Sequence, residues 1–168
     1  MEAQPINFML WIDKQVLQSF NVKKYPALRF ILKPAANAFI VLAVFYLLPA
    51  YLALSQHNME IIEVLTGQVI ISQLVGIILK ATIKRPRPLN KITFLGKIDS
   101  SFPSGHTMLA IGLALINATF FPNLSIILLF LAVLVGLGRM YLQMHYLTDV
   151  LAGACIGGIV AGLIVHFI

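Results

Sequence analysis

Long apolar segments alternate with short polar ones along the chain, and each apolar segment is about 20 residues long. A helix rises 1.5 Å per residue, so about 20 residues cross a hydrocarbon core of about 30 Å. Five such segments predict an all-α fold, a polytopic membrane helix bundle of about five transmembrane helices: 35–54, 61–80, 104–121, 124–141 and 147–168.

The segment before the first span has a different pattern. Apolar residues recur there at near-helical spacing and predict a short amphipathic helix in the membrane interface. The alternative is a loosely ordered tail. Asp13 and Lys14 interrupt the apolar region, so we do not expect a cleavable signal peptide. The positions in the series are Ile6, Met9, Leu10, Asp13, Val16, Leu17 and Phe20.

A basic collar follows this predicted helix and leads into the first span. Lys23, Lys24, Arg29 and Lys33 are suited to lipid headgroups at the end of a span. We therefore predict one domain over residues 1–168. In it, 1–34 form the interfacial helix and collar, and 35–168 form the transmembrane bundle.

Composition supports a membrane protein. Of 168 residues, 60% are hydrophobic and 11% are charged, against about a quarter charged in soluble domains. A water-soluble globule is therefore excluded. Cys155 is the only cysteine, so no intrachain disulfide can form.

The net charge of +6 suits an anionic lipid surface, a nucleic acid or a phosphorylated substrate. The positions of the charges favour a membrane site and no nucleic acid partner. With five spans, the polar loop 81–103 and the turn near 143–146 lie on the same side of the membrane. The polar residues near that side are Lys80, Lys84, Arg85, Arg87, Lys91, Lys97, His106, Arg139, His145 and Asp149.

The last span contains small residues at intervals of four. Gly153, Gly157 and Ala161 form one such series, and Gly158 and Gly162 form another. Small residues let a neighbouring helix backbone approach closely. We expect this helix to be central in the bundle.

Three groups of residues are candidates for chemistry. Asp149 follows His145 by four residues, which places both on one helix face and lets a carboxylate orient an imidazole. Ser104, Gly105 and His106 begin a span, where free backbone N–H groups favour an anion such as phosphate. A structural N-cap is the alternative for Ser104.

The third group is cationic. Lys80, Arg87 and Arg139 lie at the ends of spans, where a buried cation needs a partner or a wet cavity. A phosphate is a suitable partner, because guanidinium groups bind its oxygens in pairs.

Together these groups resemble the signature of the type 2 phosphatidic acid phosphatase superfamily: K-x6-R-P, then P-S-G-H, then S-R-x5-H-x3-D. Lys80 and Arg87-Pro88 match the first motif, and the spacing excludes Arg85 as its arginine. The second motif is residues 103–106, and the third runs from Gly138 to Asp149. The family serine is Gly138 here, so one hydroxyl donor to phosphate is absent. We expect Gly138→Ser to raise activity or leave it unchanged.

The resemblance implies a two-step phosphoryl transfer. His145 would be the nucleophile, Asp149 would orient it, and His106 would protonate the leaving oxygen. The implied phosphate-binding residues are Lys80, Arg87, Ser104, Gly105 and Arg139. Independently of the family, only Asp99 and Asp149 lie near this face, too few carboxylates for a two-metal hydrolase, so we expect no metal and no other cofactor.

These expectations describe a membrane lipid phosphatase whose partners are a phosphorylated lipid and the bilayer. Phosphatidylglycerophosphate, undecaprenyl pyrophosphate, phosphatidic acid and lipid A phosphates all remain possible substrates. The alternatives are a lipid-to-lipid phosphotransferase with the same site and a non-catalytic lipid-phosphate binder or transporter; a haloperoxidase is disfavoured for so small a membrane chain.

The position of the site relative to the membrane is also open. All Lys and Arg residues fall on the active-site side, which the positive-inside rule places in the cytoplasm. The resemblance to bacterial lipid phosphatases implies the opposite side. About half of these charges can be assigned to phosphate binding, and we predict an inner-membrane protein with an extracytoplasmic site.

Overall fold

The computed structural model describes residues 5–89 and 100–168, with side chains from Leu10 onward. Of the polar residues expected at the active face, Lys91, Lys97 and Asp99 lie outside the described residues. Every element within the described ranges is helical, which confirms the all-α fold class. The elements are α1 (Pro5–Ser19), η1 (Pro26–Leu28), α2 (Arg29–Ala35), α3 (Ala38–Leu42), η2 (Ala43–Leu47), α4 (Leu48–Ser55), α5 (Met59–Ile83), α6 (Gly105–Phe120), η3 (Pro122–Leu124), α7 (Ser125–Tyr141) and α8 (Leu147–His166).

Each of the five predicted spans corresponds to helical structure. Four are long and apolar enough to cross a membrane: Ala38–Ser55, Met59–Ile83, Pro122–Tyr141 and Leu147–His166. The remaining one, α6, is apolar but has only 16 residues. α5 extends three residues past its predicted end, to Ile83, and the C-cap residue Lys84 ends the helix with a left-handed φ of 46°.

The first span is continuous through a π-helical turn. α3, η2 and α4 follow one another without a break, and Pro49 lies in the first turn of α4. Proline has no N–H, so it cannot bond the carbonyl of Phe45 one turn earlier. Asn117 of α6 supplies a donor instead, because its Nδ2 lies 3.0 Å from Phe45 O.

The centre of the bundle is α6, which packs against α5, α7 and α8. Gly153 and Gly157 of α8 face it so closely that a Cβ at either would overlap its backbone. The expected close approach is thus confirmed for these two glycines. It is wrong for Gly158 and Gly162, whose added Cβ would meet only a Leu115 side chain at 3.5 Å or nothing within 4 Å. α8 lies beside the central helix.

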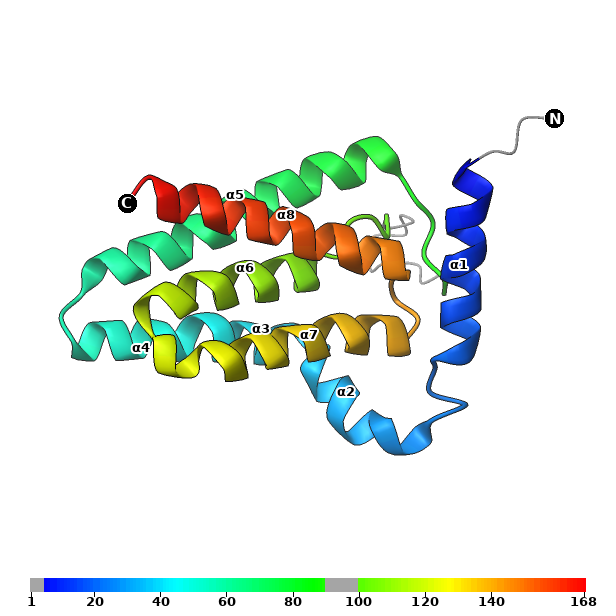
Figure 1. The fold of residues 1–168 in the computed structure, drawn as a ribbon, viewed down its shortest axis with the longest axis horizontal. Coiled ribbons are helices and arrows are strands. Elements are labelled where there is room, and N and C mark those ends of the chain that lie inside the picture. Colours follow the sequence, from blue (N-terminus) through cyan, green and yellow to red (C-terminus); the bar gives the residue numbers. More distant parts are fainter. Residues whose placement is uncertain (1–4, 90–99) are drawn as a thin grey trace.

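α1 lies across one end of the bundle, close to the start of α8 (Figure 1). The inward side of this helix contains Asp13 and Leu17, which are buried, with 0% and 6% exposed. Trp11 on the other side is 56% exposed. The described part of α1 is therefore amphipathic, as predicted, with a carboxylate on its buried side.

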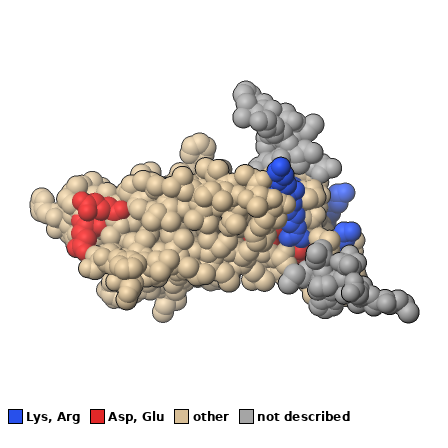
Figure 2. All heavy atoms as spheres, turned by 90° about the horizontal axis from the view of Figure 1, so that it is seen from above, with Lys and Arg blue, Asp and Glu red and all other residues tan. Residues whose placement is uncertain are grey.

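Charges are separated along the molecule. Figure 2 shows Lys and Arg at one end and an acidic group at the other. The acidic end includes Glu60, in the first turn of α5, and the opposite end of that helix contains Lys80. Basic groups of the described chain thus gather at the end crossed by α1.

Candidate active site

The ends of four helices bring the motif residues to this basic end of the bundle. Each helix contributes where it starts or stops, so the motif residues of separate segments meet in space. The last turn of α5 contains Lys80, and Arg87 follows that helix. α6 begins with Ser104 as its N-cap, then Gly105 and His106. The last turn of α7 contains Arg139, the turn before α8 contains His145, and the first turn of α8 contains Asp149.

Backbone hydrogen bonds join these segments. Ser104 N donates to Asp149 O at 3.0 Å, which connects the start of α6 to the first turn of α8. Leu89 N donates to Gln143 O at 3.3 Å, and Ser101 N donates to Arg85 O at 2.8 Å. The segment after α5, which contains Arg87, is therefore fixed to the turn that contains His145.

His145 is buried, with 1% of its surface exposed. Its Nδ1 lies 2.7 Å from Ser101 O and 3.8 Å from Asp149 Oδ2. A carbonyl only accepts, so Nδ1 carries the proton and Nε2 has the free lone pair. The sequence predicted that Asp149 holds the imidazole; the two do meet, but the short hydrogen bond is to Ser101.

The surroundings of His145 keep it neutral. Burial is the main cause that lowers its pKa below the ordinary 6.5, and the nearby Arg139 and Arg87 lower it further. Asp149 raises the pKa of His145. Nη2 of Arg139 lies 3.4 Å from Nε2 of His145. The unprotonated nitrogen therefore points toward a guanidinium.

Asp149 is fully buried and its two oxygens have different partners. Oδ2 accepts from Tyr146 N at 2.9 Å, and Oδ1 accepts from Arg85 Nη1 at 2.7 Å. Arg85 is the arginine that the spacing of the first motif excluded. Its guanidinium lies over the ring of Tyr146, 4.2 Å from the centroid.

Ser104 occupies the N-cap position of α6 but does not cap the helix with its side chain. Its buried Oγ lies 2.9 Å from Thr107 Oγ1, either of which can donate. A Cβ added to Gly105 would have no atom within 4 Å among the described residues. The first turn of α6 thus leaves open space at the backbone where the sequence predicted an oxyanion.

His106 lies close enough to the other motif residues to interact with them electrostatically. Arg139, His145, Lys80 and Arg87 all act on it electrostatically. Arg87 and Arg139 also act on His145. The structure therefore brings both histidines and three predicted phosphate ligands into one electrostatic environment.

The surroundings of Gly138 contradict the expectation that a serine would fit at position 138. A Cβ at Gly138 would lie 2.5 Å from Leu32 O and 3.0 Å from the Cβ of Ala36. The backbone at the end of α2 fills the space that a serine side chain would need. Nη1 of Arg139 also donates to Ala36 O at 3.2 Å. The premise that a serine side chain would fit is therefore wrong, because the substitution would displace the segment that holds Arg139.

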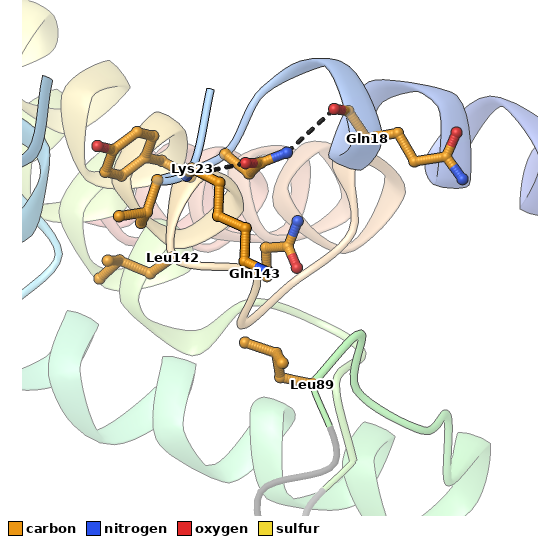
Figure 3. Close-up of a pocket in the computed structure, with 8 residues that line it drawn as sticks. Gln18, Lys23, Leu89, Leu142 and Gln143 are labelled. Carbon is orange, nitrogen blue, oxygen red and sulfur yellow. Dashed lines mark hydrogen bonds between the residues drawn. The ribbon is translucent and has the colours of Figure 1, made fainter. Parts of the chain in front are cut away.

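A cavity of about 450 Å³ lies between the end of α1 and the turn after α7 (Figure 3). Lys23 and Gln143 extend toward each other in this view, with Leu142 and Leu89 nearby. Gln143 also donates from Nε2 to Leu17 O at 3.1 Å. The cavity adjoins the backbone contact between Leu89 and Gln143 and combines one cation with amide and apolar groups.

The described residues of the site do not form a metal-binding set. Within residues 5–89 and 100–168, no group of three or more His, Cys, Asp and Glu side chains has an arrangement that could hold one. The groups close to His106 are mainly cationic. Such surroundings attract an anion.

Four contributions were not predicted: the Ser101 carbonyl, Arg85, Thr148 and Asp13. Asp13 Oδ2 accepts from Arg85 Nη2 at 2.6 Å, and its Oδ1 accepts from Thr148 N at 3.0 Å. One signal for Asp13 was present in the sequence, since it is an acid within the apolar series of an amphipathic helix. Nothing in the sequence indicated its partners.

Known proteins resemble the chain in sequence and in fold. Residues 61–168 match the model of the PAP2 superfamily. Phosphatidylglycerophosphatase B of Bacillus subtilis (strain 168) is 38% identical over 96 residues, 51% of this chain and 47% of that protein. Bacitracin transport permease protein BcrC of Bacillus licheniformis is 39% identical over 61 residues, 36% of this chain and 30% of that protein. The matched part of the chain thus spans about half or less of these relatives.

Two solved structures share the fold. The transmembrane PAP2 type phosphatidylglycerolphosphate phosphatase from Bacillus subtilis has a TM-score of 0.73 and 25% identity, over 96% of this chain and 86% of that one. Aquifex aeolicus LpxE has a TM-score of 0.71 and 23% identity, over 92% of this chain and 94% of that one. The second of these likenesses supports the fold alone.

Proposed function

Because the chain belongs to the PAP2 superfamily, we propose that it is an integral-membrane phosphatase that removes a phosphate from a phosphorylated lipid by way of a phosphohistidine. The observation that carries the proposal is the environment of His145. Its Nδ1 is fixed by Ser101 O, and its Nε2 points toward Arg139. A phosphate bound by that guanidinium would lie next to the nitrogen lone pair.

The proposed first step is an in-line attack of His145 Nε2 on phosphorus. The P–Nε2 bond forms, the bond from phosphorus to the lipid oxygen breaks, and His106 gives its proton to that oxygen. Asp149 stabilises the positive charge that develops on the His145 ring. Lys80, Arg87, Arg139, Ser104 and the Gly105 N–H bind the phosphate oxygens.

In the second step, water attacks the phosphohistidine. His106 takes a proton from the water, the P–Nε2 bond breaks, and inorganic phosphate leaves with His145 restored. No metal takes part in either step, because the cations of the chain neutralise the phosphate charge. A phosphotransferase would use the same first step with a lipid hydroxyl in place of water.

The proposed substrate is a lipid phosphate monoester or diphosphate within the bilayer, such as phosphatidylglycerophosphate, undecaprenyl pyrophosphate, phosphatidic acid or a lipid A phosphate. The cavity beside Lys23 supports an anionic or hydroxyl-bearing headgroup, since it offers an ammonium and amides. We place the protein in the bacterial inner membrane, with the active site at the extracytoplasmic face.

The test is a phosphate-release assay of the purified protein in detergent with each of these lipids. We expect release from at least one of them, inhibition by orthovanadate, which imitates the five-coordinate transition state, and no inhibition by EDTA. His145→Ala serves as the inactive control.

Three results would change the proposal. Activity lost in EDTA and restored by a divalent ion would contradict the metal-free mechanism. Binding of every lipid without release of phosphate, and without transfer to a second lipid, would favour the binder or transporter. Transfer of labelled phosphate to an added lipid alcohol would identify the phosphotransferase.

A further inference from the structure

Arg85 lies between two buried carboxylates that belong to different helices. Its Nη1 donates to Asp149 Oδ1 at 2.7 Å, and its Nη2 donates to Asp13 Oδ2 at 2.6 Å. Both aspartates are 0% exposed. Asp149 belongs to α8 and lies beside His145, whereas Asp13 lies in the middle of α1. A guanidinium therefore joins α1 to the carboxylate next to the proposed nucleophile.

Asp13 also binds the first turn of α8 directly. Its Oδ1 accepts from Thr148 N at 3.0 Å, and its Oδ2 accepts from Thr148 Oγ1 at 2.6 Å. The first turn of a helix has N–H groups without intrahelical acceptors, and its partial positive charge favours a carboxylate. Thr148 immediately precedes Asp149. Asp13 thus fixes the turn that sets the position of Asp149.

Charge balance gives Asp13 a second effect. A guanidinium bonded to Asp149 alone would neutralise that carboxylate and weaken its attraction for the imidazole ring, which becomes positive during phosphoryl transfer. With Asp13 as a second anion, the group of Asp13, Arg85 and Asp149 keeps a net charge of −1. Asp149 can then still stabilise positive charge on His145.

We propose that Asp13 is a positioning residue for catalysis, which acts through Arg85 and the first turn of α8 on Asp149 and thereby on His145. The inference rests on the proposed function, in which His145 is the nucleophile. Asp13 lies outside the residues that the family model matches, 61–168. The N-terminal helix thus contributes to the active site through a residue absent from the family signature.

Several charged groups surround His145 and contribute to its titration. Those that act on it directly are Asp149 of α8, Arg139 of α7 and Arg87 after α5. His106 of α6 faces it, and Asp13 and Arg85 lie on the far side of Asp149. Removal of Asp13 subtracts one negative charge from this set, so the pKa of His145 should move lower.

The experiment compares Asp13→Asn with the wild type in two readouts. We expect kcat to fall about 10- to 100-fold, as for residues that orient a metal-bound histidine, with KM changed less than about twofold. The acidic limb of kcat against pH should move to lower pH. The same shift should appear in the NMR titration of His145, which is one of only four histidines.

Two further variants separate charge from folding. Asp13→Glu keeps the carboxylate and should recover most of the activity and the pH limb. The double variant Asp13→Asn with Arg85→Gln restores the net charge of −1 and should return the His145 titration toward the wild type. Lys14→Gln is the matched control, because it removes one charge from the exposed side of α1 beside Asp13.

Two outcomes would overturn the inference. One is an Asp13→Asn protein with lower thermal stability but unchanged kcat and unchanged His145 titration, which would make Asp13 a structural residue only. The other is a double variant whose titration does not differ from that of Asp13→Asn. The NMR readout needs no turnover, so failure of the lipid assay for the wild type would count against the proposed function alone.

Discussion

At the residue scale, the contacts of His145 decide which of its two ring nitrogens can react. His145 has its Nδ1 bound to Ser101 O, so Nε2 is the nitrogen that can attack phosphorus. His106 lies in the first turn of α6, near the open space at Gly105. In the proposed function the two rings have different tasks, nucleophile for His145 and proton donor for His106.

This difference predicts distinct effects of two alanine variants. His106→Ala should slow hydrolysis of a lipid phosphate about 100- to 10,000-fold, because general acid catalysis is lost. An activated aryl phosphate, whose leaving oxygen needs no proton, should recover part of that loss. His145→Ala should be inactive with both substrates. The measurement is phosphate release from each substrate by the two purified variants.

Two results would contradict this assignment of roles to the histidines. Equal recovery of both variants by the activated substrate, or hydrolysis by His145→Ala at the wild-type rate, would exclude His145 as nucleophile. Thermal unfolding of both variants serves as the control, since neither histidine is needed for helix insertion and both proteins should remain folded.

A second residue-scale prediction concerns Gly138. A side chain there would overlap the end of α2 at Leu32 O, so Gly138→Ala and Gly138→Ser should both lower stability, by about 1–3 kcal/mol, the usual cost of overpacking. Activity should fall in both, because the adjacent Arg139 bonds Ala36 O. Thermal unfolding and phosphate release measure the two effects.

Gly162→Ala is the matched control for this pair. Apart from the backbone of its own helix and its chain neighbours, no described atom lies within 4 Å of a Cβ at Gly162, so that variant should keep wild-type stability and activity. A Gly138→Ser protein more active than the wild type would mean that α2 moves aside and that the hydroxyl reaches the phosphate.

At the element scale, the first span and α6 depend on each other through a buried hydrogen bond. Asn117 is 0% exposed and donates from Nδ2 to Phe45 O and to Leu113 O. The bond to Phe45 takes the place of the N–H that Pro49 lacks. A polar side chain in an apolar helix is here explained by a proline in another helix.

Asn117→Ala should therefore lower the free energy of unfolding by about 1–3 kcal/mol, since a buried carbonyl loses its donor. The loss should be smaller in a Pro49→Ala background, where residue 49 has an N–H of its own. Thermal unfolding of the two single variants and the double variant measures this coupling. kcat should be unchanged, because these residues lie away from His145.

A result with equal losses in both backgrounds would contradict this account. Thr119→Ala is a suitable control, because its hydroxyl donates only to Ile116 O, within the same helix.

Prediction from sequence succeeded where the evidence was local. Span length and apolar composition predicted the helices. Fixed motif spacing predicted that His106, His145, Asp149 and the cations share one end of the bundle, where the structure places them, and their roles stay a prediction. It failed where two distant segments meet. Arg85 and Asp13 are separated by 72 residues, and no periodicity pairs them. Gly138 was interpreted from its own motif alone, because nothing in the sequence indicates that the backbone of α2 packs against it.

At the scale of the whole molecule, charge divides the protein into a basic end and an acidic end (Figure 2). The basic end includes the candidate active site and α1, and the other end includes Glu60. An extracytoplasmic site would therefore place most Lys and Arg outside, against the usual bias. Assignment of several of these cations to phosphate removes part of that conflict.

Cysteine labelling tests this orientation. In a Cys155→Ala background, Lys24→Cys lies at the basic end and Gln56→Cys at the other, both on exposed positions. We expect a membrane-impermeant maleimide to label residue 24 in intact cells and residue 56 only after lysis. The reverse pattern would place the active site in the cytoplasm.

The shortness of α6 has a consequence for how a lipid reaches the site. Its 16 residues span about 24 Å, less than the roughly 30 Å of a hydrocarbon core. Ser104, just before α6, bonds to Asp149 O, the third residue of α8, so α6 begins below the end of its neighbour. The phosphate of a bound lipid would therefore lie closer to the acyl region of the bilayer, while the hydrocarbon chains of that lipid remain among the surrounding lipids. A lipid bound at this depth would not have to leave the leaflet, because it could reach the site by lateral diffusion.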